Sequence, residues 1–248
     1  MTVTNYEIFS NPPIVEALMD VRVKLDKDLN VENLGTLHDS IKDRYDQIKK
    51  QYVFSGTVNL GENTTFDTQP STFNGYMITS EKEKKVVQSR LDGFTYSKLN
   101  PYEHWDSFFS EGKSLFESYS EIAKPKSIFR IALRYINRIE IPIDFKDFNE
   151  YVLTNPQIAS GIPQAVSNFF LRLEIPNYEL NSKATVSLTM DKITPKKRVP
   201  LIFDIDVFRE QEYASNIEEM WNGFEDLKAF KNQIFFNTIT DKCKELFR

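Results

Sequence analysis

A strict alternation of apolar and polar side chains over residues 15–25 constrains the fold more than any other feature of the sequence. Apolar residues occupy every odd position from Val15 to Leu25, and charged residues hold most of the even positions between them. A period of two is that of an extended strand with one face buried and the other exposed. The pattern recurs over Phe129–Ile141, where apolar residues hold every odd position but 137, and Arg130, Arg134 and Arg138 lie on the other parity. The sequence therefore predicts two long, half-buried strands.

Helical spacing and turn residues place the remaining elements. Helices are predicted where apolar residues recur every three or four positions, and strands where β-branched and aromatic residues run between turn-forming residues. The predicted helices cover residues 30–52, 101–124, 145–153 and 215–247, the last starting with a capping box of Ser215 and Glu218. The predicted strands cover residues 76–80, 85–99, 168–175, 184–190 and 199–208, with short strands joined by turns over residues 53–75.

The same order of elements occurs twice, which predicts an internal repeat. Residues 1–13 form an irregular N-terminal arm, residues 14–125 a first half and residues 126–248 a second half of one continuous globular unit. We expect an α+β fold of two pseudo-repeated β-α-β-β-β-α units, with a mostly antiparallel sheet and long helices packed on one face. Trp105 and Trp221, in the aromatic stripes of the two long helices, are expected in the core.

Composition excludes several classes of function. The single cysteine, Cys243, permits no disulfide framework or thiolate cluster and is expected to be buried. His38 and His104 show no metal-ligand spacing, and His104 is expected to be exposed or to cap a helix. Neither Gly93 nor Gly223 belongs to a glycine-rich motif or a nucleophile elbow. With no nucleotide or nucleophile signature either, we expect no cofactor and no bound metal.

Charge and hydropathy limit which cellular compartment and which classes of partner are expected. A net charge of −5 and a pI near 5.3 oppose broad nucleic-acid binding. A local nucleic-acid contact stays open at the basic run Pro195–Arg198, although a solvated hairpin loop is the simpler interpretation. The chain shows no signal-peptide pattern and no apolar run of about 20 residues. We therefore expect a cytoplasmic protein without a membrane partner, of undetermined oligomeric state.

Several segments together carry a resemblance to a known family. They are Asn11–Ala17 (NPPIVEA), Tyr102 with Trp105, Arg134–Ile139 (RYINRI), Asp204–Phe208 (DIDVF), Phe235-Phe236 and Ile239-Thr240. Over nearly its whole length the chain resembles a sporadically distributed prokaryotic family of about 250 residues whose activity is not established. The resemblance therefore transfers no catalytic residues. The patchy distribution of that family is similar to that of genes on mobile or defence-associated islands, which implies a conflict-related or regulatory role.

Charged side chains on the predicted strands supply the candidate site. Alternation puts arginines and acidic residues on the strand faces opposite the apolar ones. The candidate ligand-binding residues are Arg130, Arg134, Arg138, Arg172, Asp204 and Asp206, with Glu174 beside Arg172. Two interpretations stay open: a lattice of opposite charges that solvates the sheet, or a concave groove in which arginines hold an anion. Asn137 falls on the apolar side and is expected to bond the backbone.

Two functions fit these residues. The leading interpretation is a non-enzymatic binding or regulatory module that holds an anionic small ligand or a partner protein on a curved, charged sheet face. The alternative is a metal-dependent enzyme that acts on phosphate esters through Asp204 and Asp206. An Asp-x-Asp pair on a strand places both carboxylates on one face, roughly 7 Å apart, which is wide enough to share a divalent ion through water.

Overall fold

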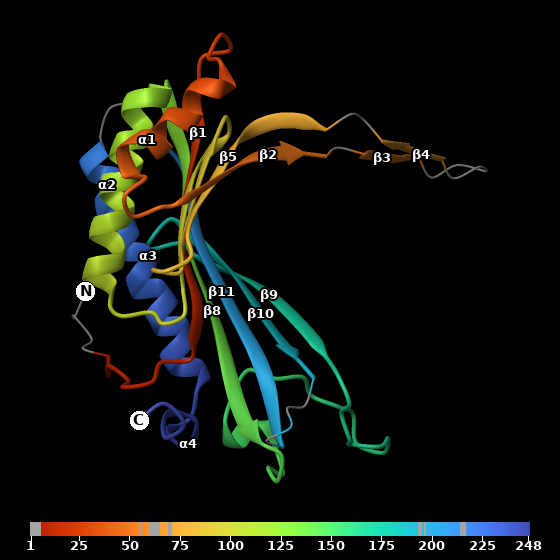
Figure 1. Ribbon diagram of the computed structural model, residues 1–248. Helices are drawn as coiled ribbons and strands as arrows, with labels where there is room; N and C mark the ends of the chain where they lie inside the picture. Colours follow the sequence, from red (N-terminus) through yellow and green to blue (C-terminus); the bar gives the residue numbers. More distant parts are fainter. Residues whose placement is uncertain are drawn as a thin grey trace. The chain divides into compact units, whose positions relative to one another are not determined.

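The computed structural model describes residues 6–54, 56–59, 65–68, 71–192, 195, 197–213 and 217–248 (Figure 1). Over residues 56–59 and 65–68 it describes the backbone alone. Among the described residues, strands account for more of the chain than helices do. The strand content is well above that of an average globular protein, so the chain is mainly a β protein.

Within the described residues, nine strands form one antiparallel sheet in the hydrogen-bonding order β2-β5-β6-β7-β1-β8-β11-β10-β9. Their bounds are β1 Ile14–Lys24, β2 Gln47–Val53, β5 Thr72–Ser80, β6 Lys85–Arg90, β7 Gly93–Leu99, β8 Ser127–Pro142, β9 Phe170–Asn177, β10 Ser182–Met190 and β11 Arg198–Tyr213. Two further strands pair with each other in a separate small sheet, β3 Gly56–Asn59 and β4 Thr65–Thr68.

Helices are few in the described part of the chain, and most of them are short. Those of more than ten residues are α2 Trp105–Ala123 and α3 Ile217–Thr238. The others are the 3₁₀ helices η1 Val31–Thr36 and η2 Phe148–Glu150, and the α-helices α1 Leu37–Ile41 and α4 Asp241–Lys244.

The predicted fold class was wrong. An α+β fold of two repeated β-α-β-β-β-α units, with long helices packed on one face, does not describe this molecule. One large antiparallel sheet dominates it instead, and the described elements do not show the internal repeat. The prediction failed because two segments that were assigned to helices contain much less helix than expected: residues 30–52 are helical only over Val31–Ile41, and residues 145–153 only over Phe148–Glu150.

The first of these segments is residues 30–52. Asn30 does cap a helix, since its side chain accepts a hydrogen bond from the backbone N–H of Glu32, but α1 ends at Ile41 and β2 begins at Gln47. Ile48 and Tyr52 are four residues apart, a spacing that fits one face of a helix and also one face of a strand, and pairing with β5 selects the strand. In the second segment, residues 145–153, only the single turn η2 is helical.

The chain divides into two compact units. Unit 1 comprises Met1–Met19, Leu99–Tyr102 and Arg130–Arg248. Unit 2 comprises Asp20–Lys98 and Glu103–Phe129. Strands β1, β7 and β8 therefore contribute residues to both units, and each unit is described by itself below.

In unit 2, helix α2 packs its aromatic stripe on the buried face of β7. Phe94 of β7 contacts Phe116, with ring centroids 5.7 Å apart, and Tyr96 stacks on Phe108 at 5.2 Å. Lys124, in the left-handed conformation, ends the helix as predicted, because Pro125 follows it. The core forms where aromatic side chains from the strand and the helix remove their surfaces from water together.

A partly buried carboxylate anchors α2 within unit 2. Glu111 accepts hydrogen bonds from the phenol groups of Tyr45 at 2.9 Å and Tyr96 at 3.0 Å, and pairs with Lys85 at 2.7 Å. Burial raises the pKa of Glu111, but these donors outweigh it, so the pKa lies below its usual value. Burial is also the main reason why the pKa of Tyr96 is raised. A carboxylate with several donors of this kind orients the helix.

In unit 1, helix α3 packs on the buried face of β11. Phe235 stacks on Phe203, with centroids 6.0 Å apart. Gly223 lets the helix come close to the sheet, because a Cβ at this position would stand 2.8 Å from the Cδ1 atom of Ile131. Arg209 of β11 reaches the helix and pairs with Asp226 at 2.8 Å.

Several smaller predictions can be checked against the described residues. Trp221 and Cys243 are buried, as expected, and burial raises the pKa of the Cys243 thiol to about 12. Trp105 is only half-buried, because it lies in the first turn of α2, where it stacks on Phe109. The capping box at Ser215 lies outside the described residues.

Candidate functional site: the charged face of unit 1

The candidate residues lie on one face of four neighbouring strands in unit 1, β8, β11, β10 and β9. In the ladder, Ser187 of β10 stands opposite Asp204 of β11 and Arg172 of β9, and Thr185 stands opposite Asp206 and Glu174. From Ile131 to Ile141 along β8 the residues of the other parity are buried, so the arginines project from the opposite side, as the alternation predicts. We call this surface the charged face; it consists of Arg130, Arg134, Arg138, Arg172, Glu174, Asp204 and Asp206.

The tightest ion pair on the charged face joins Arg134 to Asp204. The guanidinium Nε and Nη2 atoms donate to the two carboxylate oxygens at 2.9 Å and 2.6 Å. This two-point geometry is the strongest that an arginine and a carboxylate form, and it raises the pKa of Arg134. The side chains are 41% and 19% exposed, so solvent still reaches the pair.

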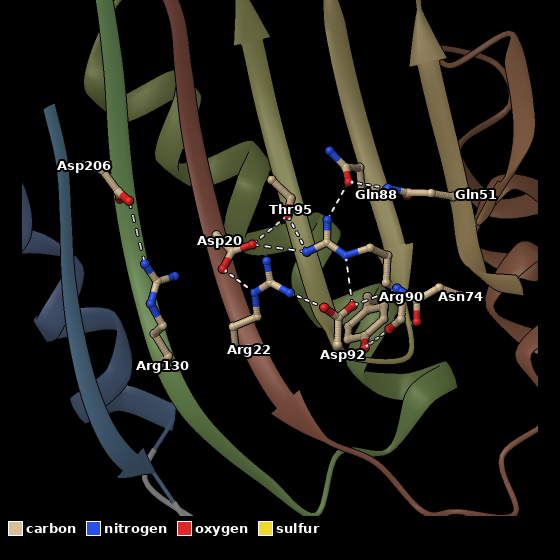
Figure 2. A network of polar contacts seen from close by, with 11 residues as sticks. Asp20, Arg22, Gln51, Asn74, Gln88, Arg90, Asp92, Thr95, Arg130 and Asp206 are labelled. Atoms are coloured by element: carbon tan, nitrogen blue, oxygen red, sulfur yellow. Dashed lines mark hydrogen bonds and ion pairs between the residues drawn. The ribbon is translucent and has the colours of Figure 1, made fainter. Parts of the chain in front are cut away.

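Arg130 and Asp206 form a looser pair. The Nη2 and Oδ2 atoms are 3.8 Å apart (Figure 2). The guanidinium carbon of Arg130 also lies 4.7 Å from the centroid of the Phe208 ring, two residues further along β11. A guanidinium over an aromatic face gains a cation–π contact, so Arg130 is positioned by an aromatic ring as well as by a carboxylate.

Arg138 has two acidic neighbours that were not predicted from the sequence. Its Nε donates to Glu140 at 2.7 Å and its Nη1 to Asp191 at 2.7 Å. The hydrogen bond from Arg138 holds the pKa of Asp191 below its usual value. Glu140 was open to prediction, since it is two residues away on the same strand face. The contact with Asp191 could not be predicted, because Asp191 follows the end of β10 and is brought next to Arg138 only by the tertiary structure.

Arg172 pairs on its own strand with Glu174, at 3.2 Å, where both side chains are largely exposed. Strand β10 separates this pair from Asp204 and Asp206. The structure thus brings Arg130 and Arg134 together with the Asp-x-Asp pair and leaves Arg172 at the edge of the charged face. Asn137 lies on the buried side and donates to the backbone carbonyl of Phe203 at 3.0 Å, as expected.

The residues that could have bound a metal are engaged with other partners. Both oxygens of Asp204 accept from Arg134, and within the described residues no group of three or more His, Cys, Asp and Glu side chains is placed to hold an ion. The Nε2 atom of His38 lies 2.9 Å from the backbone carbonyl of Tyr45. His104 caps α2 by accepting from the backbone N–H of Ser107, which confirms the predicted capping role.

A second polar cluster, in unit 2, was not anticipated from the sequence. Arg90 donates to Asp20, Thr95, Asp92 and Gln88 (Figure 2). The side chains of Arg90 and Asp20 are each 8% exposed. Asp20 also accepts from Arg22 at 2.9 Å and from Thr95 at 2.8 Å. Since its donors and acceptors satisfy one another, this cluster is a structural element of unit 2.

Comparison with models of protein families, with curated proteins and with solved structures finds no match to the chain. Among the helices that the structure describes, none has both the length and the apolar composition that crossing a bilayer requires.

Proposed function

We propose that the chain is a non-enzymatic binding or regulatory module that takes a segment of a partner protein on the charged face of unit 1. The proposal rests on two partly exposed ion pairs, Arg130 with Asp206 and Arg134 with Asp204. A small anion would have to compete with carboxylates already bonded to these arginines. A protein segment that carries both signs of charge can instead contact the arginine and the aspartate of each pair at the same time.

The neutral side chains of β10 that lie among the charged residues support a protein partner too. The hydroxyls of Thr185 and Ser187 lie between the acidic residues of β11 and the Arg172–Glu174 pair. Hydroxyls both donate and accept hydrogen bonds, so this middle strip suits amide groups better than it suits a concentrated negative charge. The exposed ring of Phe170, at one end of β9, offers an apolar contact beside the polar ones.

The experiment compares capture of proteins by the wild type and by a charge-exchanged variant. Immobilised wild-type chain, Arg134→Asp/Asp204→Arg and the control Glu218→Arg, which changes an exposed residue of α3, are incubated with lysate of the source cells. We expect one or more proteins that the wild type and the control retain and the exchanged variant loses, with binding that weakens as salt is raised. Equal retention by all three proteins would refute the proposal.

A thermal-shift series separates this function from the two other interpretations. Inorganic phosphate, nucleotides or an oligonucleotide that raise the melting temperature without metal would indicate an anion site instead. Stabilisation by Mg²⁺ or Mn²⁺ that disappears in Asp206→Asn would indicate the metal-dependent enzyme. We expect neither, because the carboxylates and the guanidinium groups already neutralise one another.

A further inference from the structure

Strand β9 has an outer edge that faces no other strand of the described chain. It is the last strand in the hydrogen-bonding order, and its inner edge pairs with β10 from Asn177↔Ser182 to Phe170↔Thr189. The described residues show no backbone hydrogen bond from Leu171–Ile175 to a loop either. Alternate N–H and C=O groups along such an edge form a template for pairing with an additional strand.

The strand at the other end of the order, β2, is protected in the usual ways. Lys49 and Lys50 lie side by side on it, and its register against β5 shifts between Gln51 and Tyr52. Lysines and bulges oppose pairing of an exposed edge with another strand. Strand β9 carries no lysine and no shift of register against β10, and its one proline, Pro176, lies near the end of the strand, so the edge from Leu171 to Ile175 is regular.

The side chains of β9 complement those of a second, antiparallel β9. With a twofold axis at Leu173, Arg172 stands opposite Glu174 of the second copy, and Glu174 stands opposite its Arg172. Directly opposite residues share a face of the sheet, so this register forms two cross-strand ion pairs on the charged face. Within one copy the side chains of Arg172 and Glu174 are 55% and 74% exposed. The ion pair between them therefore contributes little stability, and little is lost when each residue pairs with the second copy instead.

The apolar residues of β9 fit the same register. On the other face, Leu173 meets Leu173 of the second copy and Leu171 meets Ile175, all half-buried in one copy. On the same side as Arg172 and Glu174, Phe170, which is 69% exposed, stands opposite Pro176 of the second copy. A register shifted by two residues in either direction would place two arginines or two glutamates at the axis, so the charges select one register.

We infer that the outer edge of β9 is a self-association site, through which two copies of this chain form a symmetric antiparallel dimer centred on Leu173. The occupant of the edge is a second copy because the strand is complementary to itself in charge and in apolar side chains. This dimer does not depend on the function proposed above.

Charge exchange tests the inference in solution. By sedimentation equilibrium from about 1 to about 500 µM, we expect the wild type to dimerise. Arg172→Glu alone and Glu174→Arg alone should each weaken dimerisation at least about tenfold, because each places two like-charged pairs across the axis. The doubly exchanged protein, and an equimolar mixture of the two single variants, should dimerise again. Glu218→Arg, an equal charge change on α3, should leave dimerisation unchanged.

Cysteine cross-linking tests the register. Leu173→Cys places two thiols opposite each other at the axis, within the backbone separation that a disulfide accepts, whereas Ile175→Cys places them about four residues apart. With oxidised glutathione, only Leu173→Cys should give a covalent dimer; the native Cys243 is buried in both variants. A wild type that stays monomeric throughout, a mixture that fails to associate, or cross-linking at residue 175 and not at residue 173 would each overturn the inference.

Discussion

Replacing Arg90 by methionine should destabilise the protein strongly, because it breaks a buried ion pair and leaves the other charge in place. The substitution keeps an apolar stem of similar length and removes the guanidinium, which donates to Asp20, Thr95, Asp92 and Gln88. Asp20 is then left almost without access to water. Losing one partner of a buried ion pair typically costs about 3–5 kcal/mol. Because Asp20 keeps its bonds with Arg22 and Thr95, we expect about 3 kcal/mol.

A double-mutant cycle isolates the pair itself. Asp20→Leu alone should also cost about 3 kcal/mol, since it leaves the Arg90 guanidinium partly unpaired in the same buried place. The double variant Asp20→Leu/Arg90→Met leaves neither charge behind. Its cost should therefore fall short of the sum of the single costs by about 2 kcal/mol or more.

The assay is urea unfolding followed by far-UV circular dichroism, with the free energy obtained by linear extrapolation and the m-value checked for constancy. Arg22→Met is the matched control: Arg22 belongs to the same cluster, but its side chain is 32% exposed, so its loss should cost about 1 kcal/mol or less. A cost below about 1 kcal/mol for Arg90→Met, or strictly additive costs in the cycle, would refute the reasoning.

Three further predictions concern single residues. Trp221→Ala should destabilise by about 3–5 kcal/mol in the same assay, and Trp105→Ala by only about 1–2 kcal/mol, because Trp105 is half-buried. Arg134→Ala should cost about 0–1 kcal/mol, as for other partly exposed ion pairs; a larger cost would mean that the charged face also holds the fold together. Lys242 and two backbone N–H groups hold the pKa of Glu150 at about 2, below its unfolded value of 4.5. The ionised carboxylate therefore stabilises the folded protein fully above pH 4.5, and this stabilisation is lost as the pH falls towards 2. The melting-temperature gap between the wild type and Glu150→Gln should shrink over this range; a constant gap would contradict it.

The sequence was sufficient for the long strands β1 and β8 and for the side on which the charges of β8 and β11 lie. A period of two assigns each residue of a half-buried strand to one face, and so Arg130, Arg134 and Arg138 could be placed opposite the buried residues of β8. The same rule set Asp204 and Asp206 on one face of β11, and the adjacency of β8 and β11 then paired them with arginines.

The remaining features depend on contacts between distant segments. Nothing local decides whether Ile48 and Tyr52 belong to a helix or to a strand; pairing of β2 with β5 decides it. Asp20 was assigned correctly to the polar parity of its strand, yet it is buried, because Arg90 comes from a strand 70 residues further along the chain. Local patterns assign a side chain to a face, but the environment of that face is set by tertiary structure.

The charged face and the free edge of β9 have a joint consequence. Opposite residues in antiparallel strands lie on the same face of the sheet, so a dimer formed through β9 would place both charged faces on one side of the joined ladder. Two binding faces at a fixed separation convert the second contact with a multivalent partner into an intramolecular step, which strengthens binding without a new contact. Arg172 and Glu174 would then serve two roles: across the axis they select the register, and within each copy they border the charged face. Weak binding at each charged face would be sufficient for such a module, since avidity would provide the affinity that a single, partly exposed set of ion pairs does not.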